Sequence, residues 1–245
     1  EVSKEWTDKG RWFSFHEFEL NGIPDWHANP FKKGVRAVDD TAWHKISDFN
    51  DKVGDIKTVW EASRFDWVLT MAQRTVSGDY NELARLNNWL ENWIVKNPPY
   101  RGVNWKCGQE ASIRVMHLAM AVLIFYQNNS PSESLKKLIE THLKRINSTM
   151  SYAIAQCNNH ATSEAAALFI GGQLVGGPYG KKISKKGRRT LESVVQRLID
   201  TDGTFSQYSL NYHRLMLDTL CMAEIWRMKN GEPRFCEKFY VCCQA

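Results

Sequence analysis

The sequence predicts an all-α fold, an incomplete (α/α) barrel or toroid that follows a short irregular and partly β segment. Long amphipathic segments run from Asp55 to the end of the chain, and short breaks rich in Gly, Pro, Asn and Ser separate them. Short connections make neighbouring helices antiparallel. A series of about eight such helices without a short repeated motif favours a toroid over a four-helix bundle or a strict solenoid.

The chain divides into two predicted regions. Residues 1–50 are rich in Trp, Phe, His, Pro and Gly without a steady period, which predicts an N-terminal segment that wraps around the rest. Residues 13–20 alternate like a short strand, and Asn21-Gly22 is a turn signal before a loop at 23–30. Residues 51–245 form the predicted toroid domain.

Turn signals separate the predicted helices of the toroid domain. They are SGD at 77–79, NPP at 97–99, SP at 130–131, GGP at 176–178 and DG at 202–203. The amphipathic pattern between them sets the helix bounds. The predicted helices span residues 58–77, 79–96, 107–127, 132–150, 159–174, 184–200, 208–229 and 233–245.

Composition is typical of one folded enzyme domain, with 245 residues, 43% hydrophobic and 12% aromatic. The 32 Lys and Arg against 27 Asp and Glu give a net charge of +5, which suits a polyanionic partner without requiring one. Nucleic acid is not expected, because no zinc-finger spacing or RNA-binding aromatic motif is present. The basic residues of the predicted helix 184–200 are interpreted as a solvent-exposed face. The alternative is that they form part of a basic surface that attracts a polyanion.

Cysteine usage and hydropathy exclude further classes. The six cysteines are irregularly spaced without a CxxC pair, so most are interpreted as small buried residues rather than a disulfide framework or a zinc site. No apolar run reaches the roughly 18 residues of a membrane span. Residues 1–5 lack an export signal, so an exported protein would already have lost one. No HExxH motif or carboxylate cluster is present, so no metal or other cofactor is expected.

The segment QCNNHATSEAAALF at residues 156–169 carries the most specific chemistry. It places an amide, an imidazole and a carboxylate at the head of an otherwise small and apolar helix. His160 and Glu164 are four residues apart and share a helix face, where the carboxylate can orient the imidazole. Asn159 lies near the helix N-terminus, which favours an anion. An acidic sugar is one anion that fits.

Four motifs occur in a fixed order between residues 55 and 230. They are DIKTVWEASRF at 55–65; NPPYRGVNW at 97–105 with Gln109, Glu110 and Arg114; Asn159-His160; and SLNYHR at 209–214. Their order and spacing resemble the heparinase II/III-like polysaccharide lyases, of the alginate lyase and heparinase III type. The resemblance implies an (α/α) toroid that a large antiparallel β-sandwich domain follows in this family.

The chain ends at Cys242-Cys243-Gln244-Ala245, inside a predicted helix. We therefore expect the β-sandwich domain to be missing. In the family, the missing C-terminal portion commonly contributes a histidine and other groups to the substrate-binding cleft of the toroid. We therefore expect this fragment to need that portion for a complete site.

The resemblance implies β-elimination on a polysaccharide that contains uronic acid. Asn159 and His160 would hydrogen-bond the uronate carboxylate, so that the charge developing during removal of the C5 proton falls on prearranged donors. Removing one such donor typically lowers the rate by about 10²- to 10³-fold. Tyr212 matches the family tyrosine that takes the C5 proton, donates a proton to the departing O4, or does both.

A phenol is a weak acid, so Tyr212 needs a basic neighbourhood to act near neutral pH. His213 and Arg214 are the candidates to supply it and to bind substrate. Neighbouring residues on a helix diverge by about 100°, however, and Arg214 can instead pair with Asp218.

A second group of candidate substrate-binding residues accompanies these. Trp105 can stack on a sugar ring, and Gln109 or Arg114 can hold hydroxyl or carboxylate groups. Glu110 and Arg114 can equally form an i, i+4 pair that joins two helices. Glu164 belongs to the binding set through His160. A core role is expected instead for Trp60, Arg64 and Trp67, which share a helix face.

Several alternatives stay open. An Asn-His pair at a helix start can be a cap with a surface histidine, and a tyrosine on a helix often only packs. An α/α-toroid glycoside hydrolase would need two carboxylates, for which Glu110, Glu164 and Asp202 are available. A non-catalytic acidic-polysaccharide-binding or capsule-assembly protein is the other alternative.

The motifs imply a class of substrate and leave several polysaccharides open. Heparan sulfate, hyaluronate, alginate and bacterial capsule or O-antigen uronates all satisfy the mechanism. We expect a bacterial protein that acts in the periplasm or after secretion.

Overall fold

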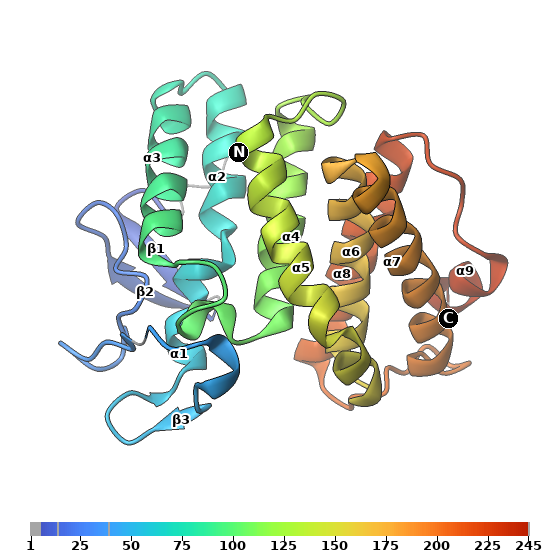
Figure 1. The fold of residues 1–245 in the computed structure, drawn as a ribbon, viewed down its shortest axis with the longest axis horizontal. Helices are drawn as coiled ribbons and strands as arrows, with labels where there is room; N and C mark the ends of the chain where they lie inside the picture. Colours follow the sequence, from blue (N-terminus) through green and yellow to red (C-terminus); the bar gives the residue numbers. More distant parts are fainter. Residues whose placement is uncertain (1–5, 14, 39, 245) are drawn as a thin grey trace. The chain divides into compact units, whose positions relative to one another are not determined.

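The computed structural model describes residues 6–13, 15–38 and 40–244 (Figure 1). The prediction about an export signal concerns residues 1–5, which lie outside the described residues, as do Ser14 of the predicted strand and Ala245 of the last predicted helix. The all-α class with a short N-terminal strand segment is confirmed. The chain forms two compact units, Glu1–Glu110 and Ala111–Ala245, and the predicted boundary at residue 50 stays a prediction.

The first unit begins with two small antiparallel strand pairs. Strand β1 (Lys9–Trp12) pairs with β2 (His16–Glu19), and β3 (Phe49–Asn50) pairs with β4 (Gly54–Asp55). The predicted strand at 13–20 therefore begins later, because the chain reverses between Trp12 and His16, which face each other across the first pair.

The predicted single helix at 58–77 is wrong. It is divided into α1 (Lys57–Trp60), a 3₁₀ turn (Glu61–Arg64) and α2 (Asp66–Val76). Phe65 between them has a left-handed backbone with φ 68°. This turn directs its ring into the core, where the ring centroids of Trp67 and Trp93 lie 5.2 and 5.0 Å away. Burial of an aromatic ring thus outweighs continuation of the helix.

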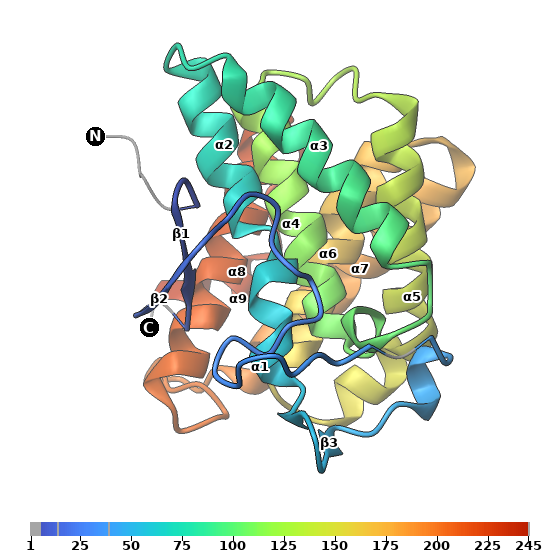
Figure 2. The ribbon, with the colours of Figure 1, turned by 90° about the vertical axis from the view of Figure 1, so that its left-hand side faces the viewer.

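Helices α2 and α3 (Asn81–Lys96) pack together in the first unit (Figure 2). Aromatic side chains fill the core between them. Trp67, Trp89 and Trp93 are fully buried. Buried indole N–H groups have acceptors: Trp67 donates to the Ala62 carbonyl at 2.9 Å and Trp93 donates to the Ser63 hydroxyl at 3.0 Å. The predicted core role of Trp60 and Trp67 is confirmed by their burial.

Arg64 joins two buried carboxylates in the first unit. Its Nε and Nη2 donate to the two carboxylate oxygens of Glu110 at 2.8 and 2.9 Å, and its Nη1 donates to Glu61. Glu61 also accepts the Phe13 backbone N–H at 2.9 Å. Burial raises the pKa of Glu61. Burial alone would lower the pKa of Arg64, but the two carboxylates raise it overall, so the guanidinium stays charged.

The second unit is a set of packed helices. Helix α4 (Gly108–Ile124) begins at the end of the first unit, and α5 (Glu133–Ala155), α6 (Asn159–Val175), α7 (Gly177–Leu198), α8 (Leu210–Lys229) and α9 (Glu237–Gln244) follow. Consecutive helices that pack through short connections, the building unit of an (α/α) toroid, are present as α5 with α6 and α6 with α7 (Figure 1). None of the described helices is both apolar enough and long enough to span a bilayer.

Helix α7 begins at Gly177 and not at residue 184 as predicted. The Gly-Gly-Pro turn signal lies inside its start, because Pro178 in the first helical turn has no N–H that needs a partner. The solvated basic face predicted for this helix is only partly correct. Lys185, Lys186 and Arg189 are exposed, but Arg188 is half-buried and donates to the carbonyls of Pro233 and Arg234.

Helix α6 is buried on all sides by α5, α7 and α8. Its contact with α7 depends on glycines that let the two backbones approach closely. A Cβ on Gly187 would lie 2.3 Å from the backbone nitrogen of Phe169, and one on Gly180 would lie 2.3 Å from the carbonyl oxygen of Gly172. No side chain fits at these positions, so the α6 to α7 crossing is determined by the absence of Cβ atoms.

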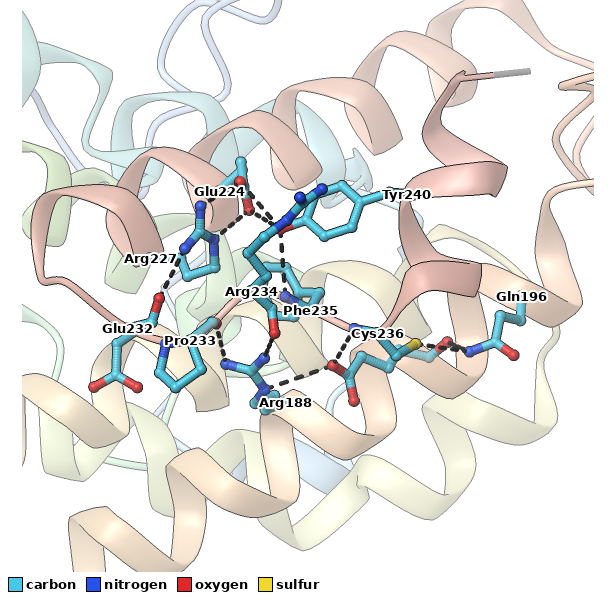
Figure 3. A network of polar contacts seen from close by, with 11 residues as sticks. Arg188, Gln196, Glu224, Arg227, Glu232, Pro233, Arg234, Phe235, Cys236 and Tyr240 are labelled. Carbon is cyan, nitrogen blue, oxygen red and sulfur yellow. Dashed lines mark hydrogen bonds and ion pairs between the residues drawn. The ribbon is translucent and has the colours of Figure 1, made fainter.

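A polar network holds the chain between α8 and α9 against α7 (Figure 3). Arg227 donates to both oxygens of Glu224 at 2.8 and 2.7 Å, and the Tyr240 hydroxyl donates to the same carboxylate at 3.1 Å. On α7, Glu192 accepts the Cys236 backbone N–H at 2.9 Å. The predicted helix at 233–245 therefore begins only at Glu237, because residues before it are engaged as extended chain.

The prediction that most cysteines are buried is wrong. Cys157, Cys221, Cys236 and Cys243 are exposed, and Cys107 and Cys242 are half-buried. All six are free thiols in this structure.

We expect Arg64→Ala to destabilise the chain by about 3–5 kcal/mol, because it leaves two buried carboxylates without their cation. Urea unfolding followed by tryptophan fluorescence measures this, since nine of the ten tryptophans precede residue 111. Arg101→Ala is the matched control, because Arg101 makes a similar two-bond pair with Asp40 on the exposed surface. Equal unfolding midpoints for the two variants would contradict the structural role of Arg64.

Gly187→Ala should lower stability although glycine is a poor helix former. Replacing a helical glycine by alanine usually gains roughly 0.5–1 kcal/mol. Here the new Cβ would collide with the α6 backbone, and we expect a loss of about 1–3 kcal/mol. Calorimetry should give Gly187→Ala a lower melting temperature than wild type. Lys185→Ala, on the exposed face of α7, should keep the wild-type melting temperature. A stabilised Gly187→Ala variant would show that the two helices separate easily.

Candidate functional site

The first turn of α6 is set by the short turn that follows α5. Cys157 has a left-handed backbone with φ 51°, and Asn158 is the N-cap, whose side chain accepts the His160 backbone N–H at 3.0 Å. The amide that caps the helix is therefore Asn158. Asn159, the residue with the proposed chemistry, is not needed as a cap, so the capping alternative does not explain it.

The backbone of Asn159 is held from two sides. Its N–H donates to the side-chain carbonyl of Gln207 at 2.9 Å, and its own carbonyl accepts the hydroxyls of Thr162 and Ser163 at 2.9 and 3.0 Å. Asn159 is 2% exposed. The residue is thus fixed in position at the buried end of the site.

His160 and Glu164 lie together as their spacing predicts. His160 Nδ1 is 3.5 Å from Glu164 Oε1, and the two side chains are 27% and 3% exposed. Burial raises the pKa of Glu164, while His160 and Arg145 counteract that increase. The second oxygen, Oε2, is buried and has no hydrogen-bond partner in the described part of the chain. The pair therefore presents an accessible imidazole in front of a buried carboxyl group.

The loop between α7 and α8 meets the first turn of α6. The loop is a tight hairpin closed by a bridge between Ile199 and Phe205. Gln207 contacts the Asn159 backbone, and the Ser206 hydroxyl donates to the Cys157 carbonyl at 3.2 Å. The structure thus brings the segment at 157–160 next to the segment at 206–207, which leads directly into α8.

The three candidates on α8 follow within its first turn and a half. Tyr212 is 43% exposed. His213 is half-buried, with its ring 6.5 Å from that of Phe205. Arg214 is exposed and makes no ion pair with Asp218 in the structure, so the alternative pairing considered for it is not formed. All three residues therefore follow closely in the chain after the loop that contacts Asn159.

A pocket of about 360 Å³ lies beside these groups. It is lined by residues 202–205, residues 207–210 and His213, so the hairpin loop and the start of α8 build it together. Gln207 belongs both to the pocket and to the hydrogen bond with Asn159.

The candidates at 105–114 are buried and have structural partners. Trp105 lies against Trp93 and donates its indole N–H to the Asn97 carbonyl at 3.0 Å. Trp105 is buried, so its ring packs in the core and is not available to stack on a sugar. Gln109 is also buried, and Glu110 is bound by Arg64.

Arg114 is buried in the second unit and donates from Nε to His142 Nε2 at 2.9 Å. The other ring nitrogen of His142 lies 2.9 Å from the Leu138 carbonyl, which requires the neutral Nδ1–H tautomer. Burial and the Arg114 charge lower the pKa of His142 to about 3. Arg114 therefore has a structural partner rather than an open site.

Sequence reasoning missed Gln207, His142 and Arg145. His142 and Arg145 occupy buried positions on the same face of α5 as Ile139 and Ile146. Polar residues at apolar positions of an amphipathic pattern are the signal that could have found them. Gln207 has no such signal, because its partner lies 48 residues away in the chain.

No group of three or more His, Cys, Asp or Glu side chains that could hold a metal ion occurs among the described residues.

The fold and site define a helical domain with a polar site at the first turn of a buried helix. A family model described as heparinase II/III N-terminus matches residues 1–240. The chain belongs to this family, and the resemblance found in its motifs is confirmed. The family relates the chain to polysaccharide lyases. No curated protein and no solved structure matches the chain significantly.

Glu164→Gln should stabilise the protein near neutral pH and not in acid. Below the ordinary pKa of 4.5, the carboxyl is protonated in both the folded and the unfolded state, so it adds no pH dependence. As pH rises above that value, the unfolded state ionises first and stability is lost until the raised pKa of the folded state is passed. The uncharged amide avoids this loss.

Melting temperatures between about pH 4 and pH 8 test this expectation. The advantage of Glu164→Gln over wild type should grow with pH, whereas Glu91→Gln on the exposed surface of α3 should show no such trend. A difference that is constant with pH would mean that Glu164 is not the titrating group.

Proposed function

We propose that this chain is the helical part of a polysaccharide lyase that cleaves a uronic-acid-containing polysaccharide by β-elimination. The observation that carries the proposal is the hydrogen-bonded contact between residues 157–159 and 206–207. This contact joins the first turn of α6, which carries Asn159 and His160, to the loop that leads into α8, which carries Tyr212, and it supports the proposal. The family supports the reaction class.

Asn159 and His160 would neutralise the uronate carboxylate. The imidazole of His160 is the more accessible of the two side chains, because 27% of it is exposed while Asn159 is 2% exposed. Glu164 holds the imidazole from behind. Donors that are fixed before substrate arrives stabilise developing charge well, because no reorganisation is needed during the reaction.

Tyr212 would carry out the proton transfer. Tyr212 is 43% exposed at the start of α8, so a polymer on the surface can contact this residue. In the elimination, the C5–H bond breaks, a double bond forms between C4 and C5, and the C4–O bond breaks, with the leaving oxygen taking up a proton. Arg214 has no Asp218 partner, so its positive charge is available to the substrate or to the phenol.

The acidic polysaccharide, a bacterial periplasmic or extracellular location, and completion of the site by a β-sandwich domain belong to this proposal. Family membership supports a polysaccharide substrate.

Tyr212→Phe should lower the rate of elimination by at least about 100-fold, as expected when a general acid or base is removed. The assay is the ultraviolet absorbance of the unsaturated product, measured on a panel of uronic polysaccharides. Tyr152→Phe, which removes a hydroxyl from an exposed tyrosine on α5, is the matched control and should keep the wild-type rate.

The same panel separates the alternatives. Unchanged turnover by Tyr212→Phe would exclude the role given to the phenol. New reducing ends without ultraviolet-absorbing product would indicate a hydrolase. Polymer binding without either product would indicate a non-catalytic binding protein.

A further inference from the structure

Three cysteines gather where α9 meets α8. Cys221 lies on α8, and Cys242 and Cys243 lie on α9. The Tyr240 hydroxyl donates to the Glu224 carboxylate at 3.1 Å and joins the two helices at this point (Figure 3). All three cysteines are free thiols in this structure, and none of them belongs to the proposed elimination site.

Helical spacing places one cysteine of each helix beside the contact between Tyr240 and Glu224. Cys221 comes three residues before Glu224, and Cys243 comes three residues after Tyr240. Residues three apart are neighbours on the surface of a helix, about one turn from each other. The two cysteines are therefore on the sides of α8 and α9 that carry this contact.

The electrostatic surroundings of Cys243 show that Cys221 is close to it. Partial burial raises the pKa of the Cys243 thiol to about 11, and the neighbouring groups of Cys242, Glu224 and Cys221 add to this increase. Because such repulsion weakens with distance, Cys221 and Cys243 lie on the same side of the contact between the helices. Cys221 is exposed, so an oxidant in solution can reach it.

We propose that Cys221 and Cys243 form a reversible disulfide that ties α9 to α8 under oxidising conditions. The oxidant is a low-molecular-weight disulfide such as oxidised glutathione. The Cys221 thiolate attacks one of its sulfurs, the S–S bond of the oxidant breaks, and one glutathione leaves as a thiolate that takes up a proton. The Cys243 thiolate then attacks the Cys221 sulfur, and the second glutathione leaves in the same way. Two protein thiols are thereby oxidised, and one oxidised glutathione is reduced to two thiols.

A disulfide between the adjacent residues Cys242 and Cys243 is the competing product. Consecutive Cα atoms are about 3.8 Å apart, which is less than the roughly 4.4–6.8 Å that a disulfide usually spans. Adjacent side chains on a helix also diverge by about 100°. This product would distort α9, whereas a link to Cys221 leaves both helices regular. The link encloses residues 221–243 and stabilises the fold by restraining the unfolded chain.

Peptide mapping of the 245-residue chain tests the proposal. The protein is equilibrated with oxidised and reduced glutathione at several ratios, and the remaining thiols are blocked before digestion with trypsin. Trypsin separates the two cysteines, because Arg227 and Lys238 lie between them. Mass spectrometry without reduction should show peptide 215–227 joined to peptide 239–245, at least about tenfold above any other pairing. The link should raise the melting temperature by roughly 5 °C.

Single substitutions identify the partners. Cys221→Ser and Cys243→Ser should each remove the linked peptides and the rise in melting temperature. Cys242→Ser should keep both effects, and so should Cys157→Ser, which changes an exposed thiol outside this group.

Three results would overturn the inference. The first is the absence of linked peptides from the wild type at every glutathione ratio. The second is a link that persists at the wild-type yield in Cys243→Ser, or a disulfide between Cys242 and Cys243 as the main product. The third is the same pattern of pairing in the folded protein and in protein unfolded by urea, because the fold would then not select the pair.

Discussion

The burial of α6 along nearly its whole length is the constraint on which the second unit depends. This helix is surrounded by α5, α7 and α8, and glycines such as Gly187 allow α7 to approach its backbone within contact distance. A helix packed so closely cannot rotate or slide without collisions. Its first turn is therefore held in one orientation, and the polar groups there are positioned by packing along the whole helix length.

Polar groups at the head of such a helix need partners, and the structure supplies them from the chain before it and from the α7–α8 loop. Asn158 caps the helix, Gln207 accepts the Asn159 N–H, and Glu164 lies behind His160. The exception is Glu164 Oε2, which is buried and has no hydrogen-bond partner among the described residues. An arrangement that keeps an unsatisfied carboxyl oxygen is costly for stability, which is typical of sites kept for function.

Family motifs in this chain carry structure as well as proposed chemistry. Within DIKTVWEASRF, Phe65 makes a left-handed turn into the core and Arg64 neutralises two buried carboxylates. The motif at 97–114 supplies Trp105 and Glu110 to the same unit as buried side chains. A shared motif therefore indicates the family reliably but does not by itself tell which residues contact substrate.

Periodicity predicted the helical class, most helix bounds and the His160 to Glu164 contact, because these depend on residues a few positions apart. Local patterns misplaced the start of α7 and the break at Phe65, where a proline in the first turn and an aromatic ring seeking the core decide the backbone. Burial of Trp105 and exposure of the cysteines also needed the packed structure.

The sequence by itself determined that this is an all-α member of the heparinase II/III N-terminal family, since amphipathic spacing and ordered motifs are properties of the linear chain. Only the tertiary structure decided that Arg64 binds Glu110 and that Gln207 binds Asn159. These partners lie 46 and 48 residues apart. No local pattern specifies such pairs, because they form only when separate helices pack at one particular distance and rotation.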